Sequence, residues 1–197
     1  MLIEKSFVIG DLTINYAEGS DNGDPLVMLH GGTAHWQQFS PLIAGLEHNW
    51  HLYACDKRGH GKSGHVKPYR MIDFVPDTVD FIKHNIGKPS VLVGHSGGAV
   101  ISMGVAAQIP GLVRALILLD PPIFLREESL KITPAYYYFA GVYAILTHQK
   151  TATQVFSELF PGLDQFLFSS GAARPRRGIP HREPDGPSRH RREPALP

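Results

Sequence analysis

The chain has 197 residues, a net charge of +1 and 43% apolar residues, a composition that fits one globular domain with a sizeable core. No apolar run approaches the roughly 18 residues of a membrane-spanning helix, and the first residues lack the basic start and apolar stretch of a signal peptide. Cys55 is the only cysteine and excludes an internal disulfide. Together these features predict a cytoplasmic protein.

Two strands joined by a tight turn are the first predicted elements. Residues 2–9 and 12–17 flank Gly10-Asp11, a two-residue hairpin signal with glycine first. We therefore expect an antiparallel pair at the start of the chain.

The next elements are a buried strand, a loop and a helix. Residues 26–29 form a continuous apolar run, typical of a strand covered on both faces. The run ends in His30-Gly31-Gly32-Thr33, a loop rich in exposed amides. A helix is expected to follow with Ser40 as its N-cap and Pro41 at its first position, and to end near His48.

A second buried strand is predicted at residues 52–55, and a glycine-rich loop follows it. Gly61-Lys62-Ser63 resembles the end of a phosphate-binding P-loop, but that motif needs its first glycine five residues before Gly61, and this position holds Asp56. We therefore interpret the loop as a structural turn in which Asp56 and Arg58 tie the backbone together.

An amphipathic helix is predicted after this loop. Val75, Val79, Ile82 and Ile86 recur at spacings of four, three and four residues, and Gly87 closes the segment. Such a helix packs its apolar face on a sheet.

The most informative stretch is Gly94-His95-Ser96-Gly97-Gly98, which lies between an apolar run at residues 91–93 and a small apolar segment at residues 99–109. Strand, sharp turn and helix are the context that makes a G-x-S-x-G motif credible, because the serine then projects from a strained apex. We predict a positive φ at Ser96, and an amide of Gly97 placed to meet a developing oxyanion. His95 is expected to point away from Ser96. An ordinary turn with an incidental serine is the alternative.

A last buried strand is predicted at residues 115–119. Strands that alternate with helices predict an α/β fold whose sheet is mostly parallel and flanked by helices.

Three motifs in this order resemble the α/β-hydrolase fold family over roughly residues 1–121: His30-Gly31-Gly32, Asp56-x-Arg58-Gly59-x-Gly61-x-Ser63 and Gly94-His95-Ser96-Gly97-Gly98. The resemblance implies that Ser96 is a nucleophile and that the N–H groups of Gly32 and Gly97 form an oxyanion hole. It implies hydrolysis of a carboxylic ester or similar acyl bond in a small, partly apolar molecule. No metal or organic cofactor, nucleic acid or membrane is expected as a partner.

A serine hydrolase also needs a histidine as base and an acid to orient it. The family places both on late strands, in the order serine, acid, histidine, and no such strand is found after residue 125. Asp120, at the end of the last predicted strand, is the candidate acid. Three later histidines have no predicted strand to hold them: His148, His181 and His190. The alternative function is therefore an inactive remnant or a ligand-binding protein of the same fold.

The chain is expected to hold a hydrolase core without its last strands at residues 1–122, a partial helical cap at 123–170 and a disordered tail at 171–197. The aromatic cap segment would line an acyl pocket or form a plain helical extension. The tail has seven Arg, six Pro and no Lys, Phe, Trp or Tyr, as in a gene read out of frame or in a genuine basic tail. Without further strands, residues 115–119 would be an exposed edge prone to pairing.

Overall fold

The computed structural model describes residues 2–123, 133–148, 151 and 154. The chain divides into two units, residues 1–125 and 126–197, and each is considered by itself. Among the described residues of the predicted cap segment, Pro134–His148 form helix α5, which belongs to the second unit. The predicted tail at residues 171–197 lies outside the described residues. Across the part of the chain that is described, no helix is both long and apolar enough to cross a membrane.

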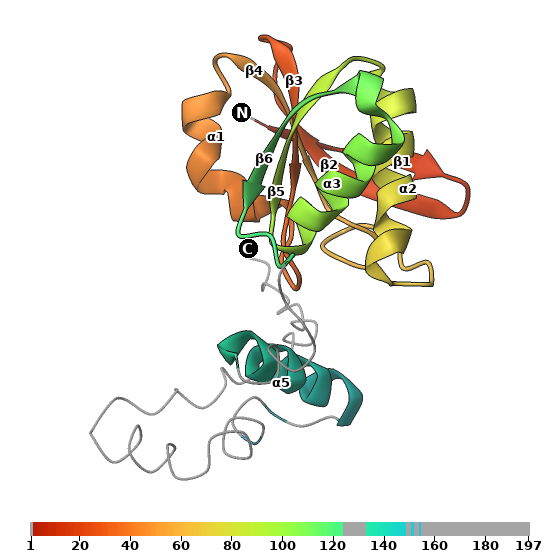
Figure 1. Ribbon diagram of the computed structural model, residues 1–197, viewed down its shortest axis with the longest axis vertical. Helices are drawn as coiled ribbons and strands as arrows, with labels where there is room; N and C mark the ends of the chain where they lie inside the picture. Colours follow the sequence, from red (N-terminus) through yellow and green to blue (C-terminus); the bar gives the residue numbers. More distant parts are fainter. Residues whose placement is uncertain (1, 124–132, 149–150, 152–153, 155–197) are drawn as a thin grey trace, which may run out of the picture. The chain divides into compact units, whose positions relative to one another are not determined.

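The first unit is built on a six-stranded sheet with the order β1-β2-β4-β3-β5-β6 (Figure 1). Its strands are β1 (Ile3–Ile9), β2 (Leu12–Glu18), β3 (Asp24–Leu29), β4 (Trp50–Cys55), β5 (Ser90–His95) and β6 (Val113–Leu119). β1 with β2 and β2 with β4 are antiparallel, and the other three pairings are parallel. The predicted hairpin and the mostly parallel sheet are both confirmed.

Helices cover the two faces of this sheet. They are η1 (Trp36–Phe39), α1 (Ser40–Leu46), η2 (Met71–Asp73), α2 (Phe74–Asp80), η3 (Phe81–Ile86), α3 (Gly97–Gln108) and η4 (Pro110–Leu112). In Figure 1, α1 lies on one side of the sheet, and α2 and α3 lie on the other. This is the layered arrangement that alternating strands and helices predict.

β3 shows why a central strand is apolar at every position. Leu26 and Met28 pack in the cluster that contains Phe39 and reaches α1, whereas Val27 and Leu29 pack in the cluster that reaches α2 and α3. Because successive side chains of a strand point to opposite faces, both sets of positions are buried.

Two helix predictions differ in detail from the structure. Ser40 is the first residue of α1 and not its cap, because η1 runs directly into the helix and Phe39 occupies the cap position without a side-chain hydrogen bond. The amphipathic segment begins as α2 and continues as the π-helical turn η3, which Gly87 ends with a φ of 67°. Val75, Val79 and Ile82 are buried, as their spacing predicted.

β6 corrects the prediction of a last buried strand. Within the described residues it pairs only with β5, so it forms one edge of the sheet. Ile117 is 46% exposed and Leu119 is 38% exposed. The expectation of an exposed apolar edge at residues 115–119 is therefore confirmed for the described part of the chain.

Candidate active site

Ser96 occupies the sharp turn between β5 and α3. Its backbone has φ 51° and ψ −117°, a region that costs a side-chain-bearing residue on the order of 1–3 kcal/mol. The turn is secured on both sides, because the Ser96 N–H donates to the Leu119 carbonyl of β6 at 2.8 Å and the Ser96 carbonyl accepts from Ala99 at 3.0 Å. The positive φ and the helix that follows agree with the sequence prediction.

Two glycines let the helix come this close to the sheet. A Cβ added to Gly98 would lie 2.0 Å from the Leu29 carbonyl oxygen of β3, and one added to Gly94 would lie 2.5 Å from the Ala99 Cα. Any larger residue at either position would push α3 away from the strands. The glycine spacing of the motif therefore fixes Ser96 at the carboxyl ends of β5 and β3.

The loop after β3 packs directly on this turn. A Cβ added to Gly31 would lie 3.4 Å from the Ser96 Cβ and 2.7 Å from His95 Nδ1. Gln38 joins the two segments, since its Oε1 accepts from the Gly31 N–H at 3.1 Å and its Nε2 lies 2.6 Å from His95 Nδ1. The His95 ring is thus engaged by Gln38, and no hydrogen bond joins it to Ser96 within the described part of the chain.

Three polar groups around the turn are free for a ligand. Among the described residues, no hydrogen bond engages the Ser96 hydroxyl or the N–H groups of Gly32 and Gly97. A hydroxyl beside two unpaired amides can attack a carbonyl carbon while the amides receive the negative charge that forms on its oxygen.

His30 and Lys57 lie beneath the loop and together hold one carbonyl group. His30 is fully buried, and its Nε2 accepts from the Lys57 backbone N–H at 3.1 Å. The ring proton must therefore sit on Nδ1, which donates to the Gly31 carbonyl at 2.7 Å. Burial and then the charge on Lys57 lower the pKa of His30 to about 3, so the ring stays neutral at physiological pH. The Lys57 Nζ donates to the same Gly31 oxygen at 3.1 Å.

The loop after β4 is structural, as predicted. The buried Asp56 carboxylate accepts from the backbone N–H groups of Trp36 at 2.7 Å and Lys62 at 3.0 Å, and from the Asn15 amide at 2.9 Å. The Asp56 side chain therefore joins three separate segments of the first unit. The amides of Trp36 and Lys62 bind this carboxylate and are not available to a phosphate.

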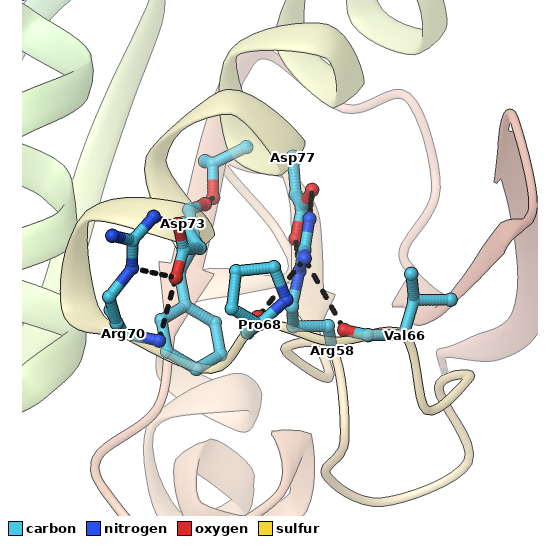
Figure 2. A network of polar contacts seen from close by, with 8 residues as sticks. Arg58, Val66, Pro68, Arg70, Asp73 and Asp77 are labelled. Carbon is cyan, nitrogen blue, oxygen red and sulfur yellow. Dashed lines mark hydrogen bonds and ion pairs between the residues drawn. The ribbon is translucent and has the colours of Figure 1, made fainter.

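Arg58 extends this scaffold toward α2 (Figure 2). Its guanidinium forms a two-pronged ion pair with the Asp77 carboxylate, at 2.6 Å from Nε and 2.5 Å from Nη2. The remaining nitrogen donates to the carbonyls of Val66 at 3.3 Å and Pro68 at 3.2 Å. The fork of donors thus fixes the course of the connecting segment before η2.

The structure describes the other predicted site residues only in part. Asp120 follows β6 directly and is exposed, with a φ of 49°. The Leu119 carbonyl accepts from the Ser96 N–H, and Asp120 is the next residue after Leu119, so the backbone of Asp120 lies near the turn. His148 is the last residue of α5 in the second unit, and nothing is described of its side chain. His181 and His190 lie outside the described residues.

Sequence reasoning did not identify Lys57 or Gln38 as part of the site. Lys57 lies within the glycine-rich loop, and nothing in its immediate sequence indicates that it contacts Gly31. The same is true of Gln38, whose role depends on how the loop after β3 folds back on the turn.

A cavity of about 20 Å³ lies under Lys57 and Phe74, between the sheet and α2. It has room for little more than a water molecule and cannot hold an acyl group. Ser96 and Gly32 do not line this cavity, and Gly32 lies on the exposed side of its loop.

Residues 24–187 match a protein family described as alpha/beta hydrolase fold. A 2-(acetamidomethylene)succinate hydrolase from Mesorhizobium japonicum is 33% identical over 129 residues, which are 65% of this chain and 46% of that relative. A serine hydrolase-like protein from Homo sapiens is 34% identical over 116 residues, 57% of each chain. The chain spans about half the length of the curated relatives it matches.

Solved structures agree with this match. The crystal structure of an E-2-(acetamidomethylene)succinate hydrolase superposes with a TM-score of 0.63 at 28% identity, over 79% of this chain and 62% of that one. An N-acyl homoserine lactonase complexed with N-butanoyl homoserine superposes with a TM-score of 0.58 at 27% identity, over 64% of this chain and 47% of that one.

Proposed function

Because this chain belongs to the alpha/beta hydrolase fold family, we propose that it is a hydrolase in which Ser96 attacks the carbonyl carbon of a carboxylic ester or similar acyl bond. The observation that carries the proposal is the backbone of Ser96, held at φ 51° between β5 and α3 beside two unpaired amides. A strained residue persists only where its surroundings enforce it, and such residues concentrate at functional sites.

The reaction follows from this geometry. The Ser96 Oγ forms a bond to the carbonyl carbon, and the carbonyl oxygen becomes an oxyanion that accepts from the N–H groups of Gly32 and Gly97. Collapse of this intermediate releases the alcohol and leaves an acyl group on Ser96, which water then removes. The hydroxyl proton passes to a basic side chain during the attack and from there to the departing alcohol, and we propose Asp120 as the acid that orients this base.

The substrate we propose is a small, partly apolar molecule with one reactive acyl bond. The names of similar proteins support the small size and the acyl bond, because they include a 2-(acetamidomethylene)succinate hydrolase and an N-acyl homoserine lactonase. Apart from the substrate and water, the proposed steps use only side chains and amides of the protein.

A ligand-binding protein of the same fold, without turnover, is the second candidate. It is favoured by one observation, that no hydrogen bond engages the Ser96 hydroxyl within the described residues. A serine without a base keeps its proton and is a weak nucleophile, although the amides beside it can still bind a carbonyl group.

A fluorophosphonate probe and p-nitrophenyl butyrate separate the two candidates. The hydrolase proposal expects covalent labelling of Ser96, seen by mass spectrometry of the labelled peptide, and ester hydrolysis that Ser96→Ala reduces by up to about 10⁶-fold. Ser6→Ala, an exposed serine on β1, is the matched control and should leave both unchanged. Saturable binding of the ester without labelling or turnover would support the binding protein and contradict the hydrolase.

A further inference from the structure

The Gly31 carbonyl is bonded more strongly than a loop carbonyl needs to be. It accepts from the neutral ring of His30 at 2.7 Å and from the ammonium of Lys57 at 3.1 Å. The Gly31 N–H is also bonded, to Gln38 at 3.1 Å. Both polar groups of Gly31 are therefore fixed, and the residue is buried.

This anchoring determines where the next amide points. The C=O of Gly31 and the N–H of Gly32 belong to one peptide plane and point in opposite directions across it. With the carbonyl bonded on the buried side, the Gly32 N–H is directed to the exposed side of the loop, where no described residue bonds it. Donors on the carbonyl also polarise the peptide and make its N–H a stronger donor.

The same ammonium lies close to the second amide. A Cβ added to Gly97 would lie 4.0 Å from Lys57 Nζ, and the ammonium also lies 5.6 Å from the centre of the Phe74 ring. Lys57 is only 7% exposed, so water screens this charge weakly. A single buried cation is thus placed beneath both residues whose amides flank Ser96.

We propose that Lys57 is a positioning residue for the oxyanion site, in which its ammonium fixes the Gly31–Gly32 peptide and adds positive potential beneath the Gly32 and Gly97 amides. The inference rests on the proposed hydrolase function and names one residue that sets how well the tetrahedral oxyanion is held. Lys57 would not touch the substrate, because its Nζ is bonded to the far side of the peptide.

The protonation of Lys57 makes this role testable by pH. Burial lowers the pKa of Lys57 to about 8, so the ammonium is present at neutral pH and lost in mildly alkaline solution. Several other titratable or charged side chains lie around it: His30, His60, Asp56, and the Arg58–Asp77 pair. Burial also lowers the pKa values of both histidines, so neither gains or loses a proton near pH 8.

The sequence offers an unusually clean spectroscopic probe of this peptide. In a chain labelled with glycine that carries ¹³C at the carbonyl and ¹⁵N at the amide, only adjacent glycines give a carbonyl-to-amide correlation. The two such pairs are Gly31-Gly32 and Gly97-Gly98. The first reports on the proposed contact, and the second is an internal control in α3.

We expect the Gly31-Gly32 correlation of the native chain to move with a midpoint near pH 8. Lys57→Met, which keeps the length of the side chain but removes donor and charge, should shift this correlation and abolish its movement with pH. Lys57→Arg keeps donor and charge, so its correlation should stay near the native position at pH 7 without a transition near pH 8.

The same samples titrated with butylboronic acid connect this peptide to the chemistry, because boron binds a serine oxygen as a tetrahedral anion. We expect the dissociation constant to rise about tenfold in Lys57→Met and to return to within about threefold of native in Lys57→Arg, less than the loss of a whole oxyanion donor.

Two results would overturn the inference: a Gly31-Gly32 correlation that moves no more than the Gly97-Gly98 control in Lys57→Met, or unchanged boronate affinity in that variant. Failure of the proposed function is a different result, in which Ser96→Ala binds the boronate as well as the native chain does. The glycine correlations would then still decide whether Lys57 holds the peptide.

Discussion

β5 and β6 are neighbouring parallel strands that end in the same unusual way, and they differ in how that ending is supported. Ser96 follows β5 with a φ of 51°, and Asp120 follows β6 with a φ of 49°. β5 is paired on both sides and buried, whereas β6 is paired only with β5 among the described residues and exposes Ile117 and Leu119.

The difference teaches what holds a strained serine in place. At Ser96, a helix packs so closely that Gly98 has no room for a Cβ, and the backbone is bonded to Leu119 on β6. Asp120 is exposed, and no tight packing of this kind is described around it. The turn that carries the proposed nucleophile is therefore held by close packing, while the proposed acid lies on an exposed edge.

The largest expected effect comes from breaking the close packing at the end of β5. In Gly98→Ala the new methyl group would lie 2.0 Å from the Leu29 oxygen, so α3 must move. We expect a loss of about 3 kcal/mol or more in the free energy of unfolding, measured by urea denaturation. Gly45→Ala in α1, where a Cβ has nothing within 4 Å, is the control and should be neutral or stabilising. Equal effects of the two changes would contradict this account.

The second prediction compares the loss of one apolar side chain from each of the two strands. Leu92 of β5 is fully buried, whereas Ile117 of β6 is 46% exposed. Leu92→Ala should lower the free energy of unfolding by about 2–5 kcal/mol, and Ile117→Ala by less than about 1 kcal/mol, because the second change leaves no closed cavity. The same urea titration measures both. A cost for Ile117→Ala close to that for Leu92→Ala would mean that another part of the chain covers β6.

The third prediction concerns the buried cation beneath the β5 turn. The pKa of Lys57 falls from 10.5 to about 8 on burial. Below pH 8 the folded state carries the full cost of the buried charge; from about pH 8 to 10.5 the unfolded state binds more protons, so the contribution to stability rises with pH. Lys57→Met should therefore stabilise the protein by about 2–3 kcal/mol at pH 7, with the gain disappearing by about pH 10.5.

The measurement for Lys57→Met is urea unfolding at a series of pH values. Lys83→Met, at an exposed position in η3, serves as the control and should show no such pH-dependent gain. A gain for Lys57→Met that stays constant with pH would show that lost charge is not its cause.

The smallest effect isolates the strain itself. Ser96→Gly relieves the backbone and Ser96→Ala does not, so the glycine variant should be more stable than the alanine variant by about 1 kcal/mol or more. For Asp120→Gly against Asp120→Ala the same difference should be smaller, because this residue is exposed and its backbone can relax when alanine replaces it. Thermal unfolding of the four variants gives both differences, and a larger difference at Asp120 would reverse the comparison drawn above.

Much of the fold was predictable from local pattern. Residues 26–29 and 91–93 read as central strands, because a strand buried on both faces must be apolar at every position. The turn at Ser96 could also be predicted, since only glycines at positions 94 and 98 allow the helix to pack against the strands. These features depend on residues that are close in sequence, so the local sequence pattern is enough to predict them.

Only the tertiary structure decided the rest. Residues 115–119 are as apolar as a central strand, and their exposure follows from the position of β6 at the edge of the sheet. The contact between Lys57 and Gly31 joins residues 26 apart, and it exists because β3 and β4 are parallel neighbours whose ends lie side by side. No local pattern specifies such a contact, because its distance is set by strand order and register.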